Sequence, residues 1–249
     1  MEKRTQIWAH RGYSLKYPEN TMLAFEQASI HGADGIELDV HLSGDGVPVI
    51  IHDNRLERTT NGRGWVEEKS SHELRQLDAG SWKGAEFSDC RIPTLEEVLD
   101  WVVKRVPYMT VNLELKRSRG NPSYDRLAQR VLSLVKQYRM LEKVIFSSFQ
   151  HPLLCILKEM ESQAQTGLLV AEPIHRPWVY MKHWKANAYH PDYRLLDQST
   201  LEILQAQGIR VHVYTVNHRE AAQKLTSAGV DAMITDCLED IRDALEEKN

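Results

Sequence analysis

Short apolar runs alternate with segments of helical spacing along most of the chain. The apolar runs have the length and composition of strands, and the segments between them repeat apolar positions every three or four residues. The predicted strands span residues 6–10, 35–42, 47–51, 110–115, 143–147, 166–170, 186–189, 210–215 and 232–235. The predicted helices span residues 19–31, 71–77, 123–138, 152–161, 175–184, 197–207, 219–228 and 238–247. One more begins at Thr94, which is predicted to be its N-cap, with Glu97 completing a capping box. This alternation predicts βα units around a parallel sheet.

The second and third strands are joined by only four residues, 43–46. A parallel crossover needs a dozen or more residues, so these two strands are expected to form a hairpin. Centring the turn within these residues places Glu37 roughly opposite His52. The two-residue period of a strand then puts Glu37 and Asp39 on the same face. Local spacing alone therefore predicts that two carboxylates and one histidine lie together.

Nine predicted strands exceed the eight of a TIM (β/α)8 barrel. The hairpin partner at 47–51 is the expected surplus strand, and the sequence leaves open which strand closes the barrel. Residues 54–92 are polar and glycine-containing and interrupt the alternation. We therefore predict a single domain over residues 1–249, with 54–92 as a small inserted subdomain. A doubly wound open sheet is the alternative, and the absence of G-x-G-x-x-G after the first strand weakens it.

Composition and charge exclude several classes of protein. With 249 residues, 42% hydrophobic and 27% charged, the chain has an ordinary globular composition. A net charge of -4 argues against a nucleic-acid partner. Cys90, Cys155 and Cys237 are widely spaced without zinc-site spacing, which indicates free thiols in a reducing compartment. No signal peptide and no apolar run of ~18 residues are present, so a cytoplasmic protein without membrane insertion is expected. The oligomeric state stays open.

Polar residues gather at the predicted strand ends, where barrel enzymes build their active sites. Glu37, Asp39 and Glu114 are hard oxygen donors that would repel one another without a cation. Such a set predicts one divalent cation, Mg²⁺ or Ca²⁺, with Mn²⁺ as an alternative. The competing interpretation is that the three carboxylates form salt bridges with Arg11 and Lys116.

Two histidines and two cations accompany these carboxylates. His10 and His52 are candidates for general acid and base, because imidazole titrates near neutral pH. A core histidine or a zinc ligand is the alternative for each. Arg11 and Lys116 are candidates to hold phosphate oxygens, and charge balance for the carboxylates is their alternative role.

Three further residues are candidates for contact with a substrate. Glu19 and Asn20 precede a predicted helix, where Asn20 is equally suited to cap the helix or to contact substrate or metal. Tyr214 ends a predicted strand and suits either core packing or substrate contact. The aromatic segment 178–184 lies in a basic stretch, and either packs on the barrel as an amphipathic helix or forms an interfacial surface.

In these motifs the chain resembles the glycerophosphodiester phosphodiesterase family. The matching residues, in chain order, are His10-Arg11-Gly12, Pro18-Glu19-Asn20-Thr21, Asp34-Gly35-Ile36-Glu37-Leu38-Asp39-Val40, His52-Asp53, residues 56–62, Pro93-Thr94-Leu95-Glu96-Glu97, Leu113-Glu114-Leu115-Lys116, Ser147-Ser148-Phe149, Thr215-Val216-Asn217, Gly229-Val230-Asp231 and Thr235-Asp236. The chain departs from the family at Tyr214, where tryptophan is usual, and at Cys237-Leu238, where a proline is common.

The resemblance implies a TIM barrel with an insertion after His52. It further implies metal binding by Glu37, Asp39 and Glu114, acid and base roles for His10 and His52, and phosphate contacts from Arg11 and Lys116. The implied reaction is metal-dependent hydrolysis of a small glycerophosphodiester to sn-glycerol 3-phosphate and an alcohol. Water and the substrate's own 2-hydroxyl both stay open as the nucleophile. A lysophospholipase D acting on lysophospholipids is the alternative enzyme, and a non-catalytic phosphodiester-binding protein is the alternative from another class.

Overall fold

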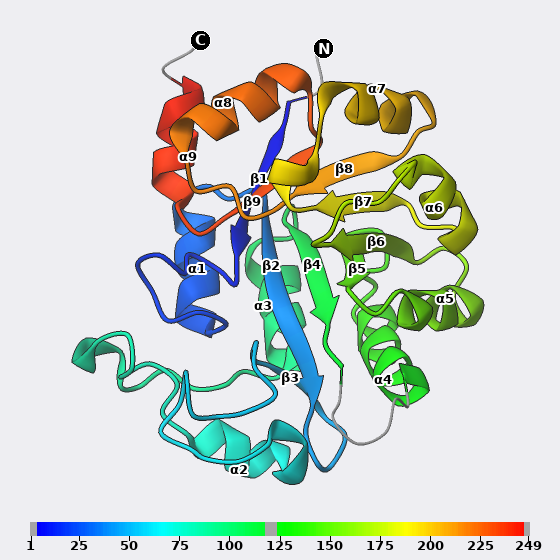
Figure 1. Cartoon of the computed structure of the whole chain (residues 1–249). Coiled ribbons are helices and arrows are strands. Elements are labelled where there is room, and N and C mark those ends of the chain that lie inside the picture. Colours follow the sequence, from blue (N-terminus) through cyan, green and yellow to red (C-terminus); the bar gives the residue numbers. More distant parts are fainter. Residues whose placement is uncertain (1–3, 118–123, 247–249) are drawn as a thin grey trace.

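Eight parallel strands close into a barrel in the computed structural model, which describes residues 4–117 and 124–246 (Figure 1). The strands are β1 (Gln6–His10), β2 (Gly35–Leu42), β3 (Pro48–Ile50), β4 (Thr110–Leu115), β5 (Val144–Ser148), β6 (Gln165–Val170), β7 (Ala188–Pro191), β8 (Arg210–Val213) and β9 (Ala232–Thr235). β1 pairs in parallel with both β2 and β9, which closes the ring. β3 is the surplus strand and lies antiparallel on β2. The predicted TIM barrel is confirmed, and the open-sheet alternative is wrong.

Helices surround this barrel on its outer face, as Figure 1 shows. They are α1 (Met22–Ile30), α3 (Leu95–Arg105), α4 (Tyr124–Gln137), α5 (His151–Met160), α6 (Pro177–Trp184), α7 (Gln198–Ala206), α8 (Arg219–Ala228) and α9 (Leu238–Glu246). The predicted capping box of α3 is present: Thr94 accepts from the backbone N–H of Glu97, whose carboxylate accepts from the backbone N–H of Thr94. The predicted starts and ends at Ser123 and Glu247 lie outside the described residues.

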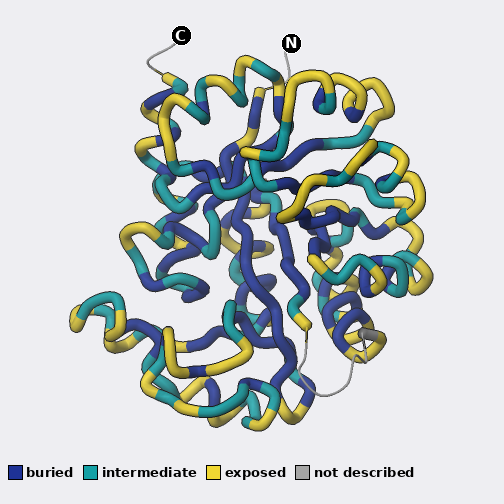
Figure 2. The backbone as a smooth tube through the Cα atoms, in the orientation of Figure 1, coloured by how far each residue is buried: buried dark blue, intermediate teal, exposed yellow. Residues whose placement is uncertain are grey.

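Side chains alternate between the helix layer and the barrel interior. On β4, Val111, Leu113 and Leu115 join the main hydrophobic core beneath the helices. Asn112 and Glu114, at the intervening positions, therefore point into the barrel. Figure 2 shows that the strands are buried along nearly their whole length. The interior positions nearest the carboxyl ends of the strands are polar, and they supply the site described below.

Residues 54–92 form a compact segment beyond the carboxyl end of β2, at the bottom of Figure 1. The segment contains α2 (Ser71–Gln76) and two short 3₁₀ helices, η1 (Val66–Glu68) and η2 (Ala85–Phe87). It has a small hydrophobic cluster that also includes Val49 of β3 and Ile51, which follows β3. The cluster members within the segment are Leu56, Val66, Leu74, Ala79 and Ile92, with Leu77 packed against them.

The hairpin register differs by one residue from the sequence prediction. Val40 pairs with Ile50, so the prediction that Glu37 lies opposite His52 is wrong. The difference arises in the turn: five residues, 43–47, rather than four connect β2 to β3, and within them the backbone N–H of Ser43 donates to the carbonyl of Val47. His52 therefore follows the paired part of the hairpin instead of belonging to it.

Candidate active site

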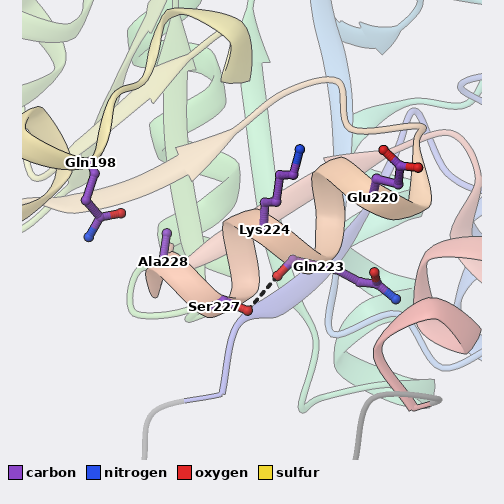
Figure 3. Close-up of a pocket in the computed structure, with 6 residues that line it drawn as sticks. All are labelled: Gln198, Glu220, Gln223, Lys224, Ser227 and Ala228. Atoms are coloured by element: carbon purple, nitrogen blue, oxygen red, sulfur yellow. Dashed lines mark hydrogen bonds between the residues drawn. The ribbon is translucent and has the colours of Figure 1, made fainter.

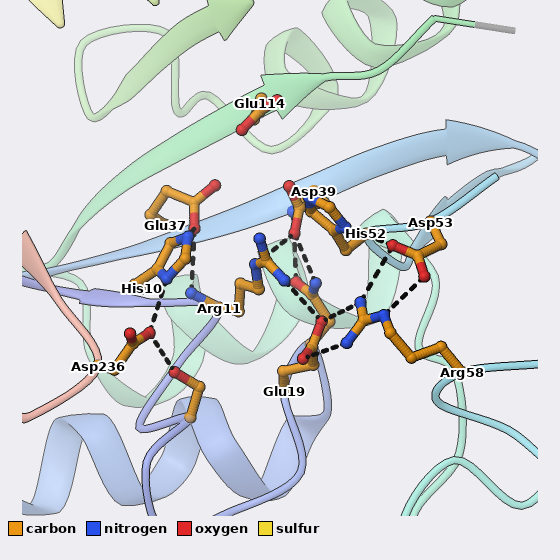
Figure 4. A network of polar contacts seen from close by, with 12 residues as sticks. His10, Arg11, Glu19, Glu37, Asp39, His52, Asp53, Arg58, Glu114 and Asp236 are labelled. Carbon is orange, nitrogen blue, oxygen red and sulfur yellow. Dashed lines mark hydrogen bonds and ion pairs between the residues drawn. The ribbon is translucent and has the colours of Figure 1, made fainter. Parts of the chain in front are cut away.

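The register of three neighbouring strands brings the predicted acidic residues together. His10 of β1 pairs in register with Glu37 of β2, and Asp39 of β2 pairs with Glu114 of β4. Since all three strands are parallel, these side chains meet at one end of the barrel (Figure 4). One oxygen from each of Glu37, Asp39 and Glu114 lies within 4.8 Å of the other two, and all three residues are buried.

The three carboxylates differ in their electrostatic surroundings. Burial and the charge of Asp39 raise the pKa of Glu37 to about 8. Burial also raises the pKa of Glu114, although Lys116 opposes that shift. Burial alone would raise the pKa of Asp39 too, but the adjacent cations Lys116 and Arg11 hold it well below its usual range. Asp39 is therefore already compensated by cations, whereas at Glu37 the charges of His10 and Arg11 do not outweigh burial and the charge of Asp39.

The donor set fits a hard divalent cation. Glu37 Oε2 accepts a hydrogen bond from the backbone N–H of Arg11 at 3.0 Å, but the buried Oε1 has no hydrogen-bond partner among the described residues. A buried carboxylate oxygen without a partner is costly unless a proton or a cation satisfies it. Three carboxylates, with no nitrogen or sulfur donor in the cluster, match the ligands preferred by Mg²⁺ and Ca²⁺.

Each candidate catalytic histidine is held by an aspartate through Nδ1. His10 Nδ1 lies 2.7 Å from Asp236 Oδ1, and that carboxylate also accepts hydrogen bonds from Ser14 Oγ and Asn217 Nδ2. Burial would lower the pKa of His10, but the hydrogen bond to Asp236 and the charge of Glu37 outweigh it and raise the pKa. His10 Nε2 faces Glu37 Oε2 at 3.9 Å, so the free nitrogen points at the acidic cluster.

His52 has the opposite electrostatic balance. Its Nδ1 lies 2.5 Å from Asp53 Oδ1, which leaves Nε2 unoccupied by that contact. Burial lowers the pKa of His52, with further lowering from Lys116 and Arg11, and this outweighs the charge of Asp39. The pKa of Asp53 is lowered to about 2: burial opposes the shift, and hydrogen bonds from Arg58 and His52 outweigh it.

The two candidate phosphate-binding cations bridge the carboxylates. Lys116 Nζ lies 2.9 Å from Asp39 Oδ1 and also pairs with Glu114. Arg11 Nη1 donates to Glu19 Oε1 at 2.8 Å, and its Nε lies 3.3 Å from Asp39 Oδ2. Both side chains are less than one-fifth exposed, at 15% and 19%. Arg11 and Lys116 therefore do balance the charge of neighbouring carboxylates, which was their alternative role in the sequence analysis. These ion pairs are compatible with a phosphate contact by the same side chains.

Arg58 of the segment 54–92 connects the partner of His52, Asp53, with the partner of Arg11, Glu19. Its guanidinium donates to both oxygens of Asp53, at 2.6 and 3.1 Å. It also donates to both oxygens of Glu19, at 2.9 and 2.8 Å. Figure 4 shows the resulting chain of contacts from His52 through Asp53, Arg58 and Glu19 to Arg11.

Asn20 and Tyr214 each had two candidate roles. Asn20 does not cap α1, because Thr21 occupies that position and accepts from the backbone N–H of Ala24. Instead Asn20 Nδ2 donates to Asp39 Oδ2 at 2.7 Å. The Tyr214 hydroxyl donates to the backbone carbonyl of Val170 at 2.8 Å. Substrate contact by Tyr214 stays a prediction.

A family model described as the glycerophosphoryl diester phosphodiesterase family matches residues 10–239, a span that includes every side chain of this site. The chain belongs to the glycerophosphoryl diester phosphodiesterase family.

Relatives of this family cover nearly the whole chain. The glycerophosphodiester phosphodiesterase of Caldanaerobacter subterraneus subsp. tengcongensis is 38% identical over 233 residues, which are 94% of this chain and 94% of the relative. That of Bacillus altitudinis is 37% identical over 234 residues, 93% of this chain and 94% of the relative. Among solved structures, an Oleispira antarctica phosphodiesterase in complex with the product sn-glycerol-3-phosphate superposes with a TM-score of 0.90 at 34% identity, covering 98% of this chain and 97% of that chain.

The structure of this family member gives a place in the site to residues that the sequence analysis included in its matching motifs without assigning them a role. Asp236 and Asn217 each follow a barrel strand, and that position was the available signal. Asp53 is adjacent to His52 in the sequence. Arg58 lies in the matching stretch 56–62, but nothing local assigned it a role, because its partners depend on how the segment 54–92 folds back on the barrel.

Other features of the family member lie apart from this site. An open depression on α8 is lined by polar side chains (Figure 3), with Gln198, Glu220, Gln223, Lys224, Ser227 and Ala228 around it. Cys90, Cys155 and Cys237 are free thiols, as predicted. Within residues 4–117 and 124–246, no helix has the length and apolar character needed to cross a membrane.

Proposed function

We propose that this protein is a metal-dependent phosphodiesterase that hydrolyses glycerophosphodiesters to sn-glycerol 3-phosphate and an alcohol. One observation carries the proposal: two histidines, each held by an aspartate at Nδ1, accompany a buried cluster of three carboxylates at the mouth of the barrel. The family membership and the Oleispira antarctica structure with sn-glycerol-3-phosphate support the same reaction.

In this proposal His10 and His52 move the protons. Asp236 and Asp53 fix the ring orientation and the tautomer, because each accepts from Nδ1. Nε2 of each ring is then the atom that exchanges a proton. One histidine removes a proton from the nucleophile, whose oxygen forms a bond to phosphorus. The bond between phosphorus and the leaving alcohol oxygen breaks, and the other histidine protonates that oxygen.

Arg11 and Lys116 bind the phosphate oxygens in this proposal. Arg11 is held by Asp39 and Glu19, and Lys116 by Asp39 and Glu114, which keeps both cations beside the cluster, where the singly charged phosphate of a diester would meet them. Arg11 offers a planar fork, and Lys116 offers a point charge. Glu19, Asn20 and Tyr214 are proposed to shape the substrate side of the site.

Glu37, Asp39 and Glu114 would hold the divalent cation, Mg²⁺ or Ca²⁺, with Mn²⁺ as the third candidate. When bound, such a cation polarises a phosphoryl oxygen and stabilises the negative charge that develops in the transition state. The buried Glu37 Oε1, which has no partner among the described residues, supports this placement. We further propose that residues 1–249 act as one domain in which 54–92 is an inserted subdomain.

The test is release of sn-glycerol 3-phosphate from glycerophosphocholine and glycerophosphoethanolamine by protein stripped with EDTA. Mg²⁺, Ca²⁺ and Mn²⁺ are then added back separately. We expect no release from the stripped protein and restored release with at least one cation. Folded protein that releases no product with any of the three cations would contradict the proposal.

A further inference from the structure

Arg58 occupies a junction between the two sides of the site. It comes from the segment 54–92, whereas its partners Asp53 and Glu19 follow different strands, the surplus strand β3 and the barrel strand β1. Four hydrogen bonds of 2.6–3.1 Å join its guanidinium to both oxygens of each carboxylate. Nη2 is shared: it donates to Asp53 Oδ1 and to Glu19 Oε1.

The two oxygens that share Arg58 Nη2 also hold the functional side chains. Asp53 Oδ1 is the oxygen that contacts His52 Nδ1 at 2.5 Å. Glu19 Oε1 is the oxygen that accepts from Arg11 Nη1 at 2.8 Å. One nitrogen of Arg58 therefore lies one contact away from a proposed proton-transfer group and one contact away from a proposed phosphate-binding group.

We propose that Arg58 is a positioning residue that fixes His52 through Asp53 and Arg11 through Glu19, so that the segment 54–92 sets the geometry of the site. This inference rests on the proposed function. Without the guanidinium, the carboxylates of Asp53 and Glu19 lose the cation between them and repel each other. Each is then free to rotate, and the ring of His52 and the fork of Arg11 lose their fixed orientation.

The donors of Arg58 distinguish positioning from substrate binding. Nε, Nη1 and Nη2 all donate to carboxylates, so the guanidinium is already engaged on both of its hydrogen-bonding edges. Arg58 should therefore act on turnover more than on substrate affinity. A lysine at this position keeps the charge but lacks the fork, so it should restore part of the effect.

The matched control is Arg55, three residues earlier in the same segment. Arg55 also pairs through Nε and Nη2 with a carboxylate, that of Glu57, and it is 50% exposed against 42% for Arg58. Among the described residues, the carboxylate of Glu57 accepts hydrogen bonds from Arg55 and from the backbone N–H of Gly64, and from no residue of the site. Arg55→Gln therefore removes the same kind of ion pair from the same segment without touching the proposed network.

The experiment compares kcat and KM for Arg58→Gln, Arg58→Lys, Arg55→Gln, Asp53→Asn and the double variant Arg58→Gln/Asp53→Asn. We expect Arg58→Gln to lower kcat on the order of 10–100-fold, as for other residues that orient functional side chains, and to raise KM by a smaller factor through the loosened Arg11. Arg58→Lys should fall between it and wild type, and Arg55→Gln should match wild type. The double variant should be no worse than about twofold below the poorer single variant, because both act through His52.

Three results would overturn the inference. The first is an Arg58→Gln variant with the same kcat and KM as Arg55→Gln. The second is a loss in Arg58→Gln that falls on KM alone. The third is a double variant in which the losses of kcat from Arg58→Gln and Asp53→Asn multiply. NMR of the His52 ring supplies a readout without activity: the Nδ1 proton signal should shift in Arg58→Gln and stay in Arg55→Gln. Inactive wild-type protein would contradict the proposed function, and the NMR comparison would still test the role of Arg58.

Discussion

The two site histidines make the same kind of contact, with an aspartate at Nδ1, but their electrostatic surroundings differ. Asp236 and Asp53 each accept from an Nδ1 atom, yet the pKa of His10 is raised from 6.5 and that of His52 is lowered from it. Burial lowers both values; the hydrogen bond to Asp236 and the charge of Glu37 reverse it at His10, whereas Lys116 and Arg11 reinforce it at His52. At a pH between the two pKa values, one ring is protonated and the other neutral. Proton transfer in the proposed reaction needs one group in each state.

Removing either ring should therefore abolish most turnover while the fold is kept. We expect His10→Ala and His52→Ala each to lower kcat by about 10²–10⁴-fold, the usual contribution of general acid–base catalysis. His72→Ala, on the exposed surface of α2, is the control and should retain wild-type activity. The measurement is steady-state release of sn-glycerol 3-phosphate, with circular dichroism to verify folding. A near-normal rate in either site variant would exclude that histidine from proton transfer.

Glu37 makes the stability of the metal-free protein depend on pH. Its pKa rises from 4.5 to about 8 on folding, so the folded state binds more protons than the unfolded state between these values. Stability of EDTA-stripped protein should therefore fall as pH rises from about 5 to 8. The lowered pKa of Asp39 acts below 3.8 and does not overlap this window. Added Mg²⁺ should raise stability most at the upper end, because the cation binds the ionised carboxylate.

Thermal unfolding across this pH range, with and without Mg²⁺, measures both effects. Glu37→Gln is the informative variant, because the amide has no proton to lose. We expect it to flatten the pH dependence of the melting temperature and to weaken the stabilisation by Mg²⁺. If the slope persists unchanged in Glu37→Gln, another group carries the linkage.

Residue identity at strand ends was enough to predict the acidic cluster. It did not predict the contacts between residues that are far apart in the sequence. Glu37, Asp39 and Glu114 could be found because strand alternation and barrel topology place them at one mouth. The contact between His10 and Asp236 joins residues 226 positions apart, so no local pattern records it. The candidate functional groups could be found from single positions, whereas the groups that orient them depend on tertiary structure.

At the level of elements, the loop after β1 is held by a tight backbone approach. Gly12 has a φ of +78°, and a Cβ built there would lie 2.7 Å from the backbone carbon of Ala24 in α1. The loop carries Arg11, itself at a φ of +55°. A side chain at position 12 would therefore force apart the start of α1 and the loop that presents Arg11.

Gly12→Ala should destabilise the protein for two separable reasons. Gly208 isolates one of them, since it has a φ of +72° with nothing within 4 Å of its built Cβ. Gly208→Ala should cost only the left-handed backbone strain, about 1–2 kcal/mol. Gly12→Ala should cost about 1–3 kcal/mol more, because it also overpacks the contact with Ala24. Urea unfolding of the two variants measures the difference, and equal losses would show that the close approach is unimportant.

Helices and strands were predicted better than the turns that connect them. The capping box at Thr94 and Glu97 marked the start of α3 correctly, because both partners are local in sequence. The predicted register of the hairpin was wrong by one residue. Ser43 hydrogen-bonds to Val47 within a connection of five residues, and sequence spacing does not reveal this geometry. A shift of one residue is enough to change which side chains face each other across two strands.

At the scale of the whole molecule, the packing of α6 bears on the choice between substrates. The aromatic residues Trp178, Tyr180 and Trp184 suggested either a packed helix or an interfacial surface. All three pack against the main core, and the Tyr180 hydroxyl lies 2.8 Å from His151 Nδ1. The largest exposed apolar side chain on this helix is Val179, at 56%. The packed-helix interpretation is therefore confirmed, and the motive for a lipid-binding surface is removed.

The protein should accordingly prefer a water-soluble diester over a lysophospholipid. We expect kcat/KM for choline release to be at least about tenfold lower with lysophosphatidylcholine than with the water-soluble substrate, because α6 offers the acyl chain no contiguous apolar surface. The water-soluble substrate is glycerophosphocholine, and the lysophospholipid is used below its micellar concentration. Val179→Glu is the matched test, since it places a charge at the exposed position of α6 without disturbing the packed aromatic residues. It should leave both rates unchanged. Comparable kcat/KM for the two substrates, with the lysophospholipid rate alone falling in Val179→Glu, would instead establish α6 as an acyl-chain contact.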